Sequence, residues 1–229
     1  MKPTAQEFST AEISKPGMPA HAQVYLQLRE MVLYGDLKPG QAVTIQGLTT
    51  RLDAGMTPVR EAIRRLTSQG ALELQGNRRV CVPLMSAADI SEIIVAREWL
   101  DPYLMRRALT NATPDDVEGM AELDTRLDAA IVDGDLRGYL ELNHQFHLAL
   151  YNLAASPILS DLAEGLWLRF GPSMRVLCGR LGTQNLPDNH KTALDAMRAG
   201  DADAAAEAIC QDVRQGMHLL RDSLQEAAG

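Results

Sequence analysis

One segment of the chain combines an amide and an imidazole at a spacing that suits metal binding. Asn143 and His147 are four residues apart, so on a helix their side chains project from the same face. Leu142, Phe146 and Leu150 indicate that this helix is largely buried, and buried polar groups need partners. Imidazole and oxygen donors together suit zinc, nickel, iron or manganese. A core histidine that is bonded to a carbonyl group or to water is the alternative explanation.

A second set of candidate residues is cationic and follows Thr57-Pro58, a typical helix start with a hydroxyl that can cap. Arg60 lies in the first turn of the predicted helix, where its guanidinium can reach O6 and N7 of guanine. Thr57 and the helix N-terminus suit a phosphate, and Arg64 and Arg65 suit the DNA backbone further along. Arginines that are merely solvated on an outer helix face are the alternative.

These arginines need a scaffold, and the hydrophobic periodicity of residues 20–84 supplies one. It predicts a helix from His21 to Gly35, a short helix over Ile45–Leu52, and a third from Thr57 to Gly70. Two short strands in residues 71–82 then form a hairpin. This order predicts a winged helix-turn-helix DNA-binding domain, in which the third helix enters the major groove. Residues 1–19 are polar and aperiodic, and we expect a flexible arm there.

The remainder of the chain is helical in pattern. A linker is predicted at residues 85–90, and residues 91–229 contain breaks that separate about six helices. Aromatic residues make up only 4% of the chain, while alanine, leucine and methionine are abundant. Packed helices suit this composition better than a β-sandwich. The predicted fold is therefore mainly α, with an antiparallel bundle of six or seven helices behind the winged domain.

The distribution of charge changes at the same boundary, between the predicted winged domain and the predicted helical bundle. Residues 20–84 carry a net charge of +3 and residues 85–229 carry −11, within a total of −8. A basic module joined to an acidic one favours nucleic acid as the partner of the first. The three cysteines have no CxxC spacing, and neither a membrane span nor a signal peptide is evident. We expect a cytoplasmic protein that has no membrane partner.

The N-terminal run Thr57-Pro58-Val59-Arg60-Glu61-Ala62-Ile63-Arg64-Arg65-Leu66, with Gly40 before it and Gly70 after it, is specific enough to suggest a family. Over residues 24–84 the chain resembles the DNA-binding domain of GntR-family transcriptional regulators. Gly55-Met56 stands where that family usually has Ser-Arg, and Arg79 where its wing usually has glycine. The DNA-binding residues are predicted to be Thr57, Arg60, Arg64, Arg65, Arg78 and Arg79.

The C-terminal part resembles the FCD domain of the FadR subfamily. Glu92, Arg97, Asp101, the Asn143–His147 pair and His190 carry this resemblance. It implies a dimerising bundle that binds a small effector, often a carboxylate, and in many members a divalent metal held by one Asp or Asn and three His. Carried over singly, the ligands are Asn143, His147, His190 and, at the third histidine position, Asp212. Aspartate can ligate a metal, but a metal-free pocket is also open.

Arg97 is the candidate for binding a carboxylate effector. It lies beside the apolar run Ile93–Ala96 on the first bundle helix, and a partly buried guanidinium favours a bidentate anion. A salt bridge to Asp101, four residues later, is the alternative.

Together these features predict a ligand-responsive transcription factor rather than an enzyme. We expect a repressor that binds a palindromic operator as a homodimer, is held together by the helical domain, and senses a small carboxylate in a metal-containing pocket. A direct metal sensor is an alternative. A metal-dependent hydrolase that uses His147, His190 and a bound water is another, although no general base or GxSxG motif is evident beside them.

Overall fold

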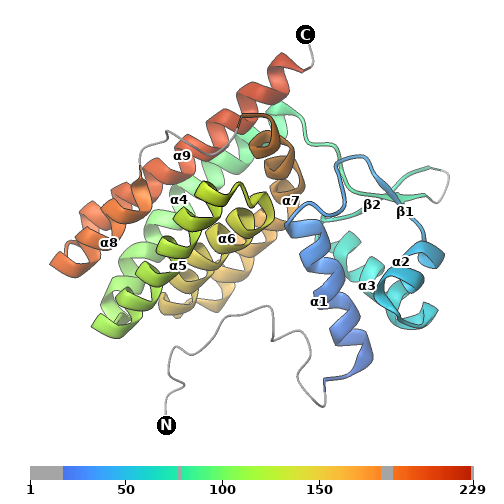
Figure 1. The fold of residues 1–229 in the computed structure, drawn as a ribbon, viewed down its shortest axis with the longest axis horizontal. Coiled ribbons are helices and arrows are strands. Elements are labelled where there is room, and N and C mark those ends of the chain that lie inside the picture. Colours follow the sequence, from blue (N-terminus) through green and yellow to red (C-terminus); the bar gives the residue numbers. More distant parts are fainter. Residues whose placement is uncertain (1–17, 77–78, 182–187, 228–229) are drawn as a thin grey trace. The chain divides into compact units, whose positions relative to one another are not determined.

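The computed structural model describes residues 18–76, 79–181 and 188–227. Its elements in chain order are α1 (Ala20–Leu33), β1 (Ala42–Val43), α2 (Ile45–Leu52), α3 (Met56–Ser68), β2 (Glu73–Leu74), β3 (Val80–Cys81), α4 (Ala87–Asn111), α5 (Pro114–Asp133), α6 (Leu136–Leu153), α7 (Pro157–Leu181), α8 (Asn189–Ala199) and α9 (Ala202–Glu226) (Figure 1). The predicted mainly α fold is confirmed. The described chain forms two compact units, one of residues up to Met85 with Trp167–Val176, the other of Ser86–Leu166 and the residues from Leu177 onward.

The N-terminal unit contains three helices and a small antiparallel sheet. The sheet has the order β1-β3-β2, so β3 lies in the middle and Cys81 faces both Ala42 and Glu73. The hairpin of β2 and β3 follows the predicted wing, but β1 was not predicted, because two residues are too few to show strand alternation. Leu28 and Leu66 are fully buried in the core of this unit.

The turn between α2 and α3 determines where α3 begins. Asp53 ends α2 in the left-handed conformation, at φ 46°, which a short polar side chain tolerates. Gly55 then takes the N-cap position of α3 with an extended backbone and no side-chain cap. The prediction that Thr57 caps this helix was therefore wrong: α3 begins one residue earlier, at Met56, and Thr57 lies within its first turn.

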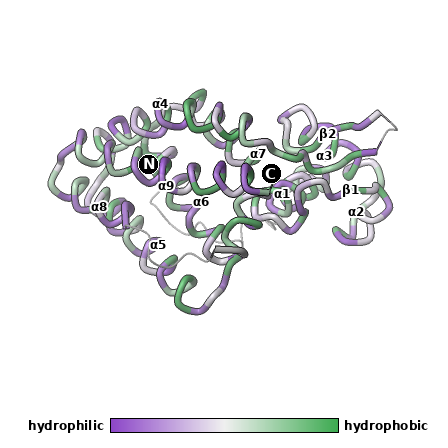
Figure 2. The backbone as a smooth tube through the Cα atoms, turned by 90° about the horizontal axis from the view of Figure 1, so that it is seen from above, coloured by the Kyte–Doolittle hydropathy of each residue, from purple (hydrophilic) through white to green (hydrophobic). Residues whose placement is uncertain are grey.

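The C-terminal unit is the helical bundle, in which α4 packs along α9 and α5 packs against both α6 and α8. Two of its helices begin with capping boxes, formed by Ser86 with Asp89 and by Thr113 with Asp116. Hydrophobic and hydrophilic residues alternate along the bundle helices, as expected for elements with one buried face (Figure 2). Among the described residues, none of the helices is both long enough and apolar enough to span a bilayer.

The capping box at Ser86 yields a stability prediction. The Ser86 hydroxyl accepts a hydrogen bond from the Asp89 backbone amide at 3.1 Å, so it satisfies one of the open donors at the start of α4. We expect Ser86→Ala to lower the free energy of unfolding by about 1 kcal/mol in urea denaturation followed by circular dichroism. The control is Ser91→Ala, since Ser91 Oγ bonds the Ala87 carbonyl inside the helix. Equal losses in the two variants would contradict the capping role.

Candidate functional site

Three side chains that come from three helices of the bundle meet in its interior. His147 on α6, His190 on α8 and Asp212 on α9 each offer one ligand atom, and these atoms lie within 4.8 Å of one another. His147 Nε2 lies 3.1 Å from Asp212 Oδ2, and His190 Nε2 lies 3.6 Å from Asp212 Oδ1. Ligands that share an ion at about 2.0–2.2 Å stand roughly 3.0–3.5 Å apart. The spacing of this cluster therefore fits one divalent ion.

The His190 ring supports the fit most directly. Its Nε2 is buried and has no hydrogen-bond partner among the described residues. Its other nitrogen, Nδ1, lies 3.1 Å from Asp124 Oδ1 on α5. Buried polar atoms are almost always satisfied, so an orphaned nitrogen beside a carboxylate suggests a group that the protein alone does not provide. A metal ion would satisfy it.

The charges in the cluster also suit a cation. Burial disfavours ionisation of Asp212, but His190, the hydrogen bond from His147 and the Arg97 charge outweigh it and lower the pKa of Asp212 to about 2. Burial lowers the pKa of His147 more than Asp212 raises it, so this imidazole favours the neutral form that ligates metals. Burial also opposes protonation of His190, but Asp212 and Asp124 together raise its pKa.

Asn143, the fourth predicted ligand, lies on α6 one turn before His147 and is half-buried. It shares the helix that carries His147. Its part in the metal cluster stays a prediction.

Arg97 lies in the interior and forms the ion pair that was the alternative to effector binding. Arg97 Nη2 lies 2.9 Å from Asp101 Oδ1, and its Nε lies 3.3 Å from Oδ2, with both residues buried. The Tyr151 hydroxyl donates to Asp101 Oδ1 at 2.6 Å. The same oxygen lies 3.7 Å from His147 Nδ1, so the pair is next to the cluster of His147, His190 and Asp212.

Two residues of this interior network were not anticipated from the sequence. The place of Tyr151 could have been predicted from the sequence, because it follows His147 by four residues on the same helix face. No local pattern predicts the place of Asp124, since it contacts His190 from 66 residues away in the sequence. Local periodicity carries no information about a pairing of that length.

A second acidic group, which extends from the interior to the surface, lies on α5 and at the start of α8. Asp124, Asp128 and Asp188 offer oxygens within 4.8 Å of one another. Lys191 pairs with both Asp128 and Asp188, and these hydrogen bonds raise the pKa of Lys191. The Lys191 ammonium already occupies both partly exposed carboxylates of this group, so we assign no metal to it.

The exposed face of α3 carries the predicted DNA-reading residues. Val59, Ile63 and Leu66 face the core, while the opposite face exposes Thr57, Arg60, Arg64 and Arg65. Two of these arginines have neighbours within the unit. Arg64 pairs with Glu61 at 3.0 Å, and the Arg65 guanidinium lies 3.7 Å from the centre of the Tyr25 ring. Arg60 is exposed in the first turn of the helix, as the predicted contact to a base requires.

In the wing, Arg79 is exposed and directly precedes β3. Its carbonyl accepts a hydrogen bond from the Gln75 amide at 2.8 Å, which closes the hairpin. Arg78, also predicted to contact DNA, lies outside the described residues.

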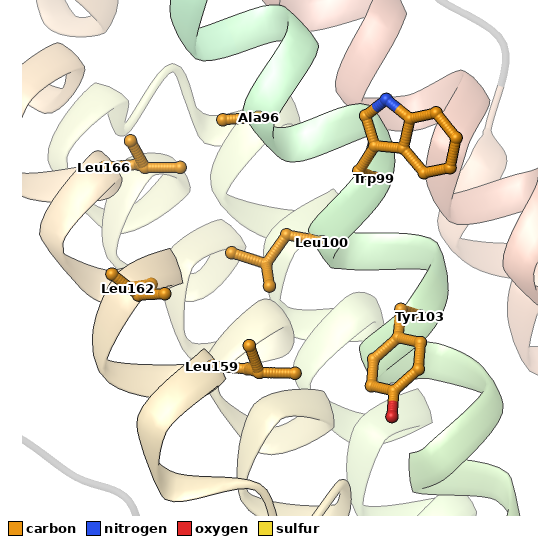
Figure 3. A pocket seen from close by; sticks show the side chains of 7 residues that line it. All are labelled: Ala96, Trp99, Leu100, Tyr103, Leu159, Leu162 and Leu166. Atoms are coloured by element: carbon orange, nitrogen blue, oxygen red, sulfur yellow. The ribbon is translucent and has the colours of Figure 1, made fainter.

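An apolar groove of about 460 Å³ lies on the surface of the bundle between α4 and α7. Its lining residues are Ala96, Trp99, Leu100 and Tyr103 from α4 and Leu159, Leu162 and Leu166 from α7 (Figure 3). Trp99 is 80% exposed and Leu162 is 58% exposed. Large apolar side chains gathered at one surface mark an interaction site.

Comparisons with known proteins agree with this architecture. Residues 20–82 match the bacterial regulatory proteins of the gntR family, and residues 92–215 match the FCD domain. The chain is 30% identical over 201 residues to the HTH-type transcriptional regulator McbR of Escherichia coli K12, covering 86% of this chain and 91% of that protein. It is 23% identical to the HTH-type transcriptional repressor RspR of the same organism, covering 92% and 93%.

A solved structure of E. coli McbR/YncC superimposes with a TM-score of 0.84 at 29% identity, covering 90% of this chain and 99% of that one. The matched families and the relatives are regulators, so the enzymatic alternative, a hydrolase, does not apply. The chain belongs to the gntR family of bacterial regulatory proteins, with an FCD domain that follows its DNA-binding domain in the sequence, and it is a transcriptional regulator.

Proposed function

We propose that this regulator senses a small carboxylate metabolite through a metal-containing pocket in its helical bundle. The observation that carries the proposal is the cluster of His147, His190 and Asp212, with the orphaned Nε2 of His190 at its centre. These three side chains, completed by Asn143, would hold the ion. A zinc, nickel, iron or manganese ion with so few protein ligands keeps coordination positions open, and a carboxylate is a suitable ligand for them.

Arg97 has a supporting part in this proposal. Because Asp101 engages its guanidinium, Arg97 contributes mainly the positive charge that it holds beside Asp212 and His147. Direct contact between Arg97 and an effector stays a prediction. With Arg97 engaged in this way, the metal ion becomes the principal cation for a carboxylate.

A direct metal sensor is the second candidate, and the same cluster supports it. The two functions differ in what changes operator affinity. A direct sensor responds to the ion alone, whereas an effector sensor needs a carboxylate in addition to the ion. Titration of zinc against operator affinity, with and without candidate carboxylic acids, separates them.

On the DNA side, we propose that α3 reads the major groove. Arg60 would contact a guanine, and Thr57, Arg64 and Arg65 would contact phosphates, with Arg78 and Arg79 in the wing adding charge toward the backbone. One such helix reads only a few base pairs, so a homodimer on a palindromic operator is expected. A relative that is named as a repressor supports repression as the mode of action.

We further propose that the apolar groove between α4 and α7 forms the dimer face. A twofold interface needs a self-complementary apolar patch, and here Leu100 points toward the leucines of α7 while Trp99, on the other side of Leu100, is 80% exposed (Figure 3). A dimer formed in this way would present two reading helices to two half-sites.

We expect Arg60→Ala to weaken binding to the operator by about 1–3 kcal/mol and to relax the preference at one base, because a bidentate contact to guanine is lost. The probe is a duplex that the wild-type protein selects from random sequences, measured by fluorescence anisotropy at fixed salt. The control is Arg126→Ala, which removes an exposed arginine from α5. Wild-type affinity and selectivity in Arg60→Ala would refute the proposed docking of α3.

Added zinc should raise the melting temperature of the wild-type protein, because an ion that binds the folded state stabilises it. His147→Ala should abolish this rise, since it removes a ligand. His218→Ala serves as the control, because His218 is half-buried on α9 outside the cluster. The metal proposal fails if zinc, nickel and manganese all leave the wild-type melting temperature unchanged and metal analysis finds well under one ion per chain.

Trp99→Asp should convert the dimer to a monomer in sedimentation equilibrium, because the variant would bury a charge at the centre of the interface. The matched control is Val132→Asp. Val132 on α5 is equally exposed, at 80%, but lies outside the groove. A dimeric Trp99→Asp protein would place the interface elsewhere.

A further inference from the structure

We propose that Asp124 is the positioning residue that makes His190 a metal ligand, an inference that rests on the metal site proposed above. Asp124 lies on α5, a helix that contributes no ligand to the cluster, and it is 3% exposed. Its Oδ1 lies 3.1 Å from His190 Nδ1. The residue therefore touches the ligand and acts through it.

The chemistry of imidazole explains what this contact does. A neutral imidazole has one N–H donor and one lone pair, and the hydrogen bond made by one nitrogen decides which of them the other nitrogen presents. A carboxylate accepts only, so Asp124 requires Nδ1 to carry the proton. The lone pair then lies on Nε2, the orphaned atom that stands 3.6 Å from Asp212 Oδ1.

A second contact fixes the plane of the His190 ring. Phe146 on α6 stacks on it with ring centroids 3.8 Å apart and an interplanar angle of 9°. Rotation of the imidazole out of this plane would break the stacking, and a flip of about 180° within the plane would break the hydrogen bond to Asp124. Nε2 is thus held toward Asp212, with both the tautomer and the orientation preset for an ion.

The charges around the cluster also support a role for Asp124 in metal binding. The buried Asp101 carboxylate pairs with Arg97, and the partly exposed Asp128 pairs with Lys191. The partner of Asp124 is His190, which is neutral when it ligates a metal. A divalent ion would balance Asp124 and Asp212 together, so the carboxylate behind His190 stabilises the ion as well as orienting its ligand.

The two histidines differ in how close a carboxylate lies to their Nδ1 atoms. Behind His147, the nearest Asp101 oxygen lies 3.7 Å from Nδ1, beyond hydrogen-bond distance, and it already accepts from Arg97 and Tyr151. His190 has such a carboxylate within hydrogen-bond distance of Nδ1, and that residue, Asp124, belongs to neither the Arg97 pair nor the ligand set. We therefore place the positioning role on Asp124.

The test uses full-length protein and zinc alone, with affinity measured by isothermal titration calorimetry in competition with a chelator. We expect Asp124→Ala to weaken zinc binding about 10- to 100-fold, the usual effect of removing a carboxylate behind a ligating histidine. Asp124→Asn should lose less, between about 3- and 10-fold, because its amide oxygen still accepts from Nδ1 but carries no charge. Nitrogen NMR of zinc-loaded wild-type protein should show His190 protonated at Nδ1.

Asp128→Ala is the matched control, because Asp128 lies one turn further along α5, carries the same charge and pairs with Lys191 instead. It should leave the zinc affinity within about twofold of wild type. An equal loss in Asp128→Ala and Asp124→Ala would overturn the proposal, since it would reveal a general charge effect.

A purely structural role for Asp124 gives a different pattern. The melting temperature without zinc would fall in Asp124→Ala, while the zinc affinity of the folded protein stayed at the wild-type value, and this result would overturn the proposal. If Asp124→Ala does not fold, Asp124→Asn decides, and wild-type affinity in that variant would also overturn it. Failure of the wild-type protein to bind zinc at all would instead refute the proposed metal site, and this inference with it.

Discussion

The interior of the bundle depends on compensation of buried charge. Asp101 is completely buried, and an isolated carboxylate there would cost several kcal/mol. Arg97 and Tyr151 compensate it through short hydrogen bonds from α4 and α6. The same principle governs the groups around it, where Asp212 meets two imidazoles and Asp124 meets one. These polar contacts connect α4, α5, α6, α8 and α9.

This compensation changes which group can attract an effector. In isolation, Arg97 would be the natural partner of a carboxylate, but Asp101 neutralises it within the protein. The remaining attraction for an anion would come from an ion held by His147, His190 and Asp212. Aspartate at the third histidine position fits such a role, because its charge balances part of the cation while open positions remain for an exogenous ligand. Metal and effector would then act as one recognition unit.

The two units of the chain use charge in opposite ways. The bundle buries and pairs a few charges in its interior, among them Arg97 and Asp101, whereas the winged unit presents arginines to solvent along one face of α3. Exposed arginines cost little to keep in the free protein and gain from the release of counterions when they contact phosphates. Not all of them are equally available, since Arg64 pairs with Glu61 and Arg65 stacks on Tyr25. Arg60, exposed in the first turn of α3, is the arginine of this face for which we propose a contact to a base.

The sequence by itself determined the features that repeat along a helix. The period of Val59, Ile63 and Leu66 defined the buried face of α3, and the order of elements with the TPVREAIRRL run identified the family. It also proposed the ligand set, Asn143 included, and an ion pair for Arg97 as one of two alternatives. Only the tertiary structure decided that Asp101 engages Arg97, that Asp124 lies behind His190, and that α3 begins at Met56 rather than with Thr57 as its cap. The physical reason is the separation along the sequence of the residues that make each contact. Helical periodicity fixes neighbours three or four residues apart, but contacts across 65 or 66 residues depend on how whole helices pack.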